Sequence, residues 1–224
     1  MQKTSVTLEF AGKPLTFETG KLAPQATSSI LARLGDTVVL VTVVCGRLRE
    51  DIDYFPLSVE YTEKLYAGGR IKGSRWVKRE GRPTDDAILI GRLIDRSIRP
   101  LFPKEFKNEV QVVITVLSVD GEHEPDILAL NAVSAAIAVS PIPWNGPIAA
   151  IRMGTVKDPE SGKLSLVYNP TSSEGDVSDL DIVVSQSKDL TVMIEAGALQ
   201  VSEDTVNEAI VAAHTETRKM LSLI

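Results

Sequence analysis

The chain has 224 residues, 43% hydrophobic and 24% charged, and a formal net charge of −6. This length allows one large domain or two small ones, and the net acidity argues against nucleic-acid binding over the whole surface, so any site for a polyanion must be local. A single cysteine, Cys45, excludes an internal disulfide, and neither a signal peptide nor a membrane-spanning segment is expected, which predicts a cytoplasmic protein.

The first predicted element is a β-hairpin, because residues 4–19 alternate apolar and polar side chains on both sides of a central AGKP. Residues 26–37 are expected to be weakly helical or irregular, and residues 37–44 read as a buried strand. Six further strands are expected at 53–63, 110–119, 148–156, 164–170, 180–187 and 190–196.

Three helices are expected. The first begins after Thr84, a good N-cap residue, and stops before Pro100. The second, residues 126–138, is apolar nearly all round and should lie between two layers. The third runs from Ser202 to an uncapped apolar end, as expected of a chain cut from a longer protein. Together these elements predict an α/β (α+β) fold with mixed sheets packed on helices.

Positive charge is concentrated in one stretch. Residues 70–107 hold eleven of the twenty-four Lys and Arg but only five of the thirty Asp and Glu. On the first helix, Arg92, Arg96 and Arg99 share one face, with isoleucines roughly opposite. The row is either a binding surface or a solvated face in which Asp95 pairs with a neighbouring arginine.

The loop before this helix favours binding. It combines cations with a lone large aromatic residue, in Arg75, Trp76, Lys78, Arg79 and Arg82. Guanidinium planes and an indole stack on unpaired bases while neutralising phosphates, so this composition indicates single-stranded nucleic acid. The alternative is a Trp76 buried for packing.

Two strings in this region, REGRP at 79–83 and RLIDRSIRPLFP at 92–103, are highly specific. With DYFPLSVEYTEKLYAGGRI at 53–71 and further matches in order, they resemble the first RNase PH-type domain of the polynucleotide phosphorylase family. The resemblance implies an RNase PH-like domain over residues 1–201, followed at 202–224 by the start of an all-helical linker domain.

The resemblance also implies an activity for the full-length protein. Such enzymes are nucleotidyltransferases in which phosphate attacks the 3′-terminal linkage of RNA and releases nucleoside diphosphates, reversibly and with Mg²⁺. They form trimeric rings around a central channel. The implied partners are therefore single-stranded RNA, phosphate, nucleoside diphosphates and two further copies of the chain.

Carried over by position, the family's RNA-gripping loop corresponds to residues 76–79, where Val77 replaces an aromatic residue and Arg75 is an apparent insertion. The resemblance also assigns arginines to the RNA path: Arg82, Arg92, Arg96, Arg99 and Arg152.

The resemblance implies that this domain is the catalytically silent copy. Asp179 and Asp181 are the only candidate catalytic or Mg²⁺-binding carboxylates, and two solvated acids are the alternative. Val183 stands where the active domain has a lysine, and the family's serine-rich phosphate loop is replaced by Glu122, Glu124 and Asp126. Mg²⁺ is expected in a second domain, and no metal site at His123 or His214. A silent ring subunit that grips RNA and a stand-alone RNase PH-type phosphorylase are the alternative functions.

Overall fold

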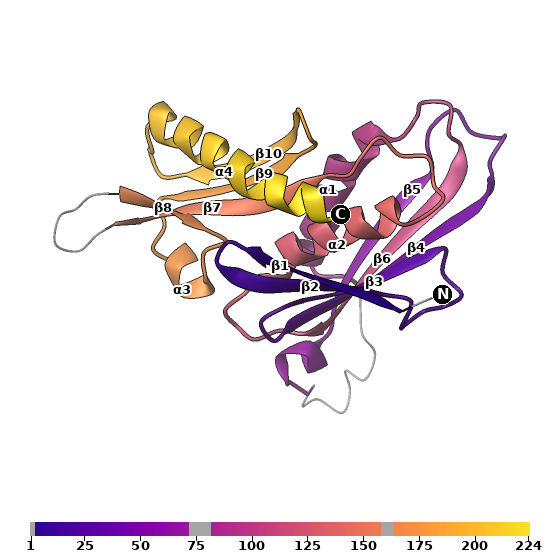
Figure 1. The fold of residues 1–224 in the computed structure, drawn as a ribbon, viewed down its shortest axis with the longest axis horizontal. Helices are drawn as coiled ribbons and strands as arrows, with labels where there is room; N and C mark the ends of the chain where they lie inside the picture. Colours follow the sequence, from indigo (N-terminus) through magenta and orange to yellow (C-terminus); the bar gives the residue numbers. More distant parts are fainter. Residues whose placement is uncertain (1–2, 72–81, 158–163) are drawn as a thin grey trace.

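The computed structural model describes residues 3–71, 82–157 and 164–224, which fold into two sheets with helices between and beside them (Figure 1). The first sheet has the strand order β1-β2-β3-β4-β6-β5 and the second β10-β9-β7-β8. The strands are β1 (Thr4–Phe10), β2 (Lys13–Thr19), β3 (Ser28–Leu34), β4 (Thr37–Leu48), β5 (Leu57–Glu63), β6 (Asn108–Ser118), β7 (Ala149–Lys157), β8 (Leu164–Tyr168), β9 (Leu180–Gln186) and β10 (Thr191–Ala198).

The described helices are α1 (Asp85–Ile98), α2 (Pro125–Ala138), α3 (Ser172–Gly175) and α4 (Glu203–Leu223), with short 3₁₀ turns η1 (Leu65–Gly68) and η2 (Arg99–Leu101). Helix α2 packs against β3 and β4 of the first sheet and β7 of the second. Every α2 residue except Ala138 is buried, which confirms the predicted helix between two layers.

Polar side chains tie α2 to the second sheet. Asn131 accepts a hydrogen bond from the backbone N–H of Ala150 at 2.9 Å and donates one to its carbonyl, also at 2.9 Å. Ser134 accepts a bond from the N–H of Ile148 at 3.0 Å. Because these buried polar groups are satisfied, they specify how α2 sits on β7 without the cost of an unpaired donor or acceptor.

Most predicted elements are confirmed, including the hairpin, the six later strands and the three helices. The prediction of a weakly helical or irregular segment at residues 26–37 was wrong. Residues Ser28–Leu34 form β3, which pairs with β2 on one side and β4 on the other. Ile30 and Ala32 are buried there, so pairing and burial override the helical preference of leucine, alanine and arginine.

Helix α4 packs against β7, β9 and β1, and Figure 1 shows it lying along the second sheet. Ser202 caps its first turn by accepting a hydrogen bond from the N–H of Thr205. Thr217 donates a buried hydrogen bond of 2.7 Å to Gln186 of β9. The expected domain division at residue 201 stays a prediction.

Candidate nucleic-acid interface

Helix α1 presents arginines to solvent. Its start is fixed by Thr84, whose hydroxyl accepts a hydrogen bond from the N–H of Ala87 at 3.2 Å. Its opposite face is anchored by Ile94 and Ile98, both fully buried, and the helix packs beside β5. The side chain of Arg92 is therefore exposed, and it forms no ion pair with any described residue.

The other two helix arginines already have partners. Arg96 is exposed and lies 3.1 Å from Glu195 of β10, an exposed ion pair that contributes little stability. Arg99 forms a two-pronged contact with Asp95, at 2.6 and 2.8 Å, and donates to the carbonyls of Phe55 and Leu57. The expected row of three displayed arginines is thus two displayed side chains and one that is hydrogen-bonded to the backbone at the start of β5.

Five further predicted RNA-binding residues precede α1 in the sequence. Arg82, just before α1, is exposed. The four predicted loop residues lie outside the described parts of the chain: Arg75, Trp76, Lys78 and Arg79.

Arg152 on β7 holds two carboxylates. Its terminal nitrogen donates to Asp126 of α2 at 2.8 Å, and its Nε lies 3.1 Å from Asp181 in an ion pair without hydrogen-bond geometry. Asp126 is almost fully buried, whereas Asp181 is largely exposed. Burial raises the pKa of Asp126, and the guanidinium opposes that rise. Arg152 thus serves first as the counter-ion of a buried carboxylate.

The N-terminus of α2 is crowded with acids. Asp126 accepts a hydrogen bond from the N–H of Ile127, which leaves that donor unavailable to an external anion. Burial, followed by the neighbouring charge of Asp126, raises the pKa of Glu124. A phosphate approaching this helix end therefore meets carboxylates in place of free N–H groups.

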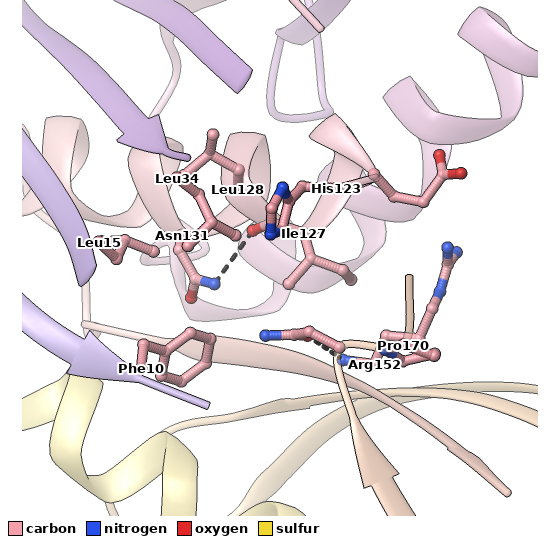
Figure 2. A pocket seen from close by; sticks show the side chains of 11 residues that line it. Phe10, Leu15, Leu34, His123, Ile127, Leu128, Asn131, Arg152 and Pro170 are labelled. Carbon is pink, nitrogen blue, oxygen red and sulfur yellow. Dashed lines mark hydrogen bonds between the residues drawn. The ribbon is translucent and has the colours of Figure 1, made fainter. Parts of the chain in front are cut away.

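The cavity beside this helix end is small. Figure 2 shows His123, Asn131 and Arg152 among its lining side chains, together with apolar residues such as Phe10 and Leu15. Its volume is about 20 Å³, enough for a single water molecule. A phosphate or nucleotide does not fit there without movement of the walls.

Sequence reasoning missed a relay of polar side chains at this cavity. His123 Nδ1 lies 2.6 Å from Asp120 Oδ2, and His123 Nε2 lies 2.7 Å from the Nζ of Lys13. Asp120 also accepts hydrogen bonds from the N–H groups of Glu122 and His123. Lys13 and His123 are 110 positions apart, so no local pattern could have connected them.

The two candidate catalytic carboxylates lie at the start of β9. Asp181 is occupied by Arg152, and Asp179 precedes β9 with its backbone carbonyl bonded to the N–H of Leu199. Among the described residues, no three or more His, Cys, Asp or Glu side chains come together in a way that could hold a metal ion. Among the described residues these two carboxylates therefore offer Mg²⁺ no third protein ligand, and their catalytic role stays a prediction.

The two-sheet α/β domain with a buried central helix is a known class. Residues 11–143 match the profile of the 3′ exoribonuclease family, domain 1, and residues 146–216 match that of domain 2. The chain belongs to this RNase PH family, which confirms the resemblance seen in its motifs.

Curated relatives named polyribonucleotide nucleotidyltransferase match nearly the whole chain. The protein from Halothermothrix orenii is 51% identical over 217 residues, and that from Chloroflexus aggregans is 49% identical over 220 residues. These alignments cover 97% and 98% of the chain but 30% and 28% of the relatives, so the chain spans less than a third of their length.

Solved structures share the fold at low sequence identity. Rice (Oryza sativa) Rrp46 has a TM-score of 0.71 at 16% identity, with 92% of this chain and 90% of that chain covered. A chain of the Archaeoglobus fulgidus exosome, solved with RNA bound to the active site, has a TM-score of 0.69 at 18% identity, with 98% and 86% covered. In the described part of the chain, no helix is long and apolar enough to cross a membrane.

Proposed function

We propose that the chain is the first RNase PH-type domain of a phosphate-dependent 3′-to-5′ exoribonuclease, a polyribonucleotide nucleotidyltransferase. In that reaction an oxygen of phosphate attacks the phosphorus of the last linkage. The bond to the 3′ oxygen of the preceding nucleotide breaks, and a nucleoside diphosphate leaves. The identity near 50% to curated relatives of that name, over almost the whole chain, carries this proposal.

The domain binds RNA and leaves the chemistry to another part of the full-length protein. The acidic end of α2, with Asp126 buried beside Arg152, supports this division, as does a cavity of about 20 Å³. Mg²⁺ is then held by residues outside this chain. The domain assembles with two further copies into a ring and works in the cytoplasm.

Arg92 and Arg96 of α1 are the main RNA-binding residues. Arg82 and the predicted loop residues, which precede α1 in the sequence, add to this contact. Arg99 and Arg152 contribute less to this contact, because their guanidinium groups are already held by Asp95 and Asp126. Exposed guanidinium groups bind phosphates of a single strand and release counter-ions as they do so.

The first test measures ADP release from poly(A) in the presence of phosphate and Mg²⁺, with the full-length Halothermothrix orenii relative as positive control. We expect ADP from the relative and none from the folded chain. ADP release by the chain would refute the silent-domain assignment and make Asp179 and Asp181 the first residues to substitute.

The second test measures oligo(A) affinity against salt concentration for Arg92→Ala combined with Arg96→Ala. The slope of log affinity against log salt should fall by about 1.4, roughly 0.7 per lost phosphate contact. Arg33→Ala combined with Arg47→Ala, on exposed positions of β3 and β4, removes the same charge and should leave the slope nearly unchanged. Equal slopes for both double variants would exclude α1 from the RNA path.

A further inference from the structure

A second hollow lies apart from α1 and from the end of α2. It runs between the last turns of α4, the loop at residues 145–147 and the β9–β10 turn, and its volume is about 680 Å³. Volumes of this order are typical of small-molecule sites. We call it the α4 groove; its lining includes Asn145, Lys188, Asp189, Leu190, Arg218 and Leu221.

The walls of the α4 groove are fixed by hydrogen bonds. Trp144 donates from its ring to the carbonyl of Ile98 at 3.1 Å, and the N–H of Asn145 donates to the carbonyl of Leu101 at 2.9 Å. On α4, Met220 is fully buried and holds the last turns against the core. The backbone walls of the groove are therefore in place before a ligand binds, and only the exposed side chains of Lys188 and Arg218 have to be ordered by it.

The β9–β10 turn forms the third wall. The N–H of Ser187 donates to the carbonyl of Leu190 at 2.8 Å, which places Lys188 and Asp189 at the tip of a tight turn. Leu190 is 69% exposed, so the turn offers an apolar surface beside its two charges.

The cations of the α4 groove are unused. Among the described residues, neither Lys188 nor Arg218 has a hydrogen-bond or ion-pair partner, unlike Arg99, Arg152 and the neighbouring Lys219. With Asp189 as the one acid, the groove carries an excess of one positive charge on a chain whose net charge is −6. Charge complementarity therefore selects an anionic ligand.

We propose that the α4 groove binds a free nucleoside phosphate. Lys188 and Arg218 hold the phosphate through charge-assisted hydrogen bonds, with the guanidinium able to take two oxygens at once. The exposed side chain of Leu190 and that of Leu221 offer apolar contact to the base, and Asp189 accepts from the hydroxyls of the sugar. The combination of cations, apolar surface and one acceptor favours a nucleotide over phosphate alone. This site is independent of the RNA path proposed for α1.

The test is calorimetric titration of the chain with ADP at low ionic strength, where screening is weak, beside adenosine and inorganic phosphate. We expect ADP to bind more tightly than either. Lys188→Ala combined with Arg218→Ala should weaken ADP binding about 100-fold, tenfold for each lost charge-assisted contact. Arg218→Lys, which keeps the charge, should retain more affinity than Arg218→Ala.

Lys3→Ala combined with Arg47→Ala is the matched control, since both residues are exposed and the pair removes the same charge. Undetectable ADP binding, or equal weakening in both double variants, would overturn the proposal. A loss of oligo(A) affinity without a loss of ADP affinity in the groove variant would also overturn it, because the groove would then contact RNA. Oligo(A) binding that stays unchanged while ADP binding falls supports it.

Discussion

Removing Arg152 should lower the free energy of unfolding, because it leaves the buried carboxylate of Asp126 without its counter-ion. The side chain of Asp126 is 7% exposed and that of Arg152 is 22% exposed, and the two meet at 2.8 Å. Breaking a buried ion pair by deleting one partner costs about 3–5 kcal/mol. Since Arg152 is partly reached by water and also neighbours the exposed Asp181, we expect Arg152→Ala to lose about 3 kcal/mol of unfolding free energy.

This loss should depend on pH. Burial already raises the pKa of Asp126, and without the guanidinium that pKa rises further. A carboxyl whose folded pKa lies above its unfolded value binds protons more readily in the folded state. The variant therefore recovers stability as pH falls through the raised pKa towards the unfolded value of about 3.9, and its gap to the parent chain is compared at about pH 8 and about pH 5.

Urea unfolding followed by circular dichroism at both pH values measures the gap. Asp126→Asn alone and combined with Arg152→Ala complete a double-mutant cycle, in which the double variant should cost less than the sum of the single variants by about 0.5–3 kcal/mol. A loss under about 1 kcal/mol at pH 8, or the same loss at both pH values, would show that Arg152 does not neutralise a buried charge.

Three further predictions concern the same framework. Burial alone would raise the pKa of Asp120, but hydrogen bonds from the N–H groups of His123 and Glu122 and from the His123 ring hold it well below its usual range. The stabilisation of the folded state by ionised Asp120 is present above the unfolded pKa of about 3.9 and is lost as pH falls below it. Asp120→Asn should therefore reduce the fall of the urea unfolding midpoint at acidic pH, and an unchanged fall would contradict the relay. Ile94→Ala, at a fully buried position of α1, should cost about 2–5 kcal/mol in urea unfolding, whereas a loss below that range would mean that the helix is loosely packed. Thr84→Ala should cost about 1 kcal/mol and Thr84→Ser much less, and equal losses in thermal unfolding would assign the effect to packing of the methyl group.

Local chemistry made much of this fold predictable. The alternation around residues 11–14, the cap at Thr84 and the continuous apolar run of α2 each appear within a few neighbouring residues. The strand β3 was missed because its own residues do not favour a strand. This segment becomes a strand because it pairs with β2 on one side and with β4 on the other.

The site was harder to predict, because its decisive contacts join distant parts of the chain. Helical spacing predicted that Arg99 would be displayed in a row with Arg92. In the structure its guanidinium instead donates hydrogen bonds to the carbonyls of Phe55 and Leu57. Sequence reasoning likewise treated Asp126 and Arg152 as separate features, although they are ion-pair partners 26 positions apart. Sequence spacing predicts which side chains share a helix face. It does not predict which hydrogen-bond or ion-pair partners from other elements they will contact.

The parallel pairing of β5 with β6 bears on the order in which the chain assembles. The antiparallel pairs β1–β2, β2–β3 and β3–β4 join strands that are adjacent in the sequence, whereas β5 meets β6 across residues 64–107. Closing so long a connection carries a larger entropic cost than closing a hairpin. Helix α1 lies wholly within that connection. The antiparallel strands β1–β4 can therefore pair before β5, on which α1 packs, is joined to the sheet by β6. During synthesis, the positively charged face would thus be completed only after β6 has left the ribosome.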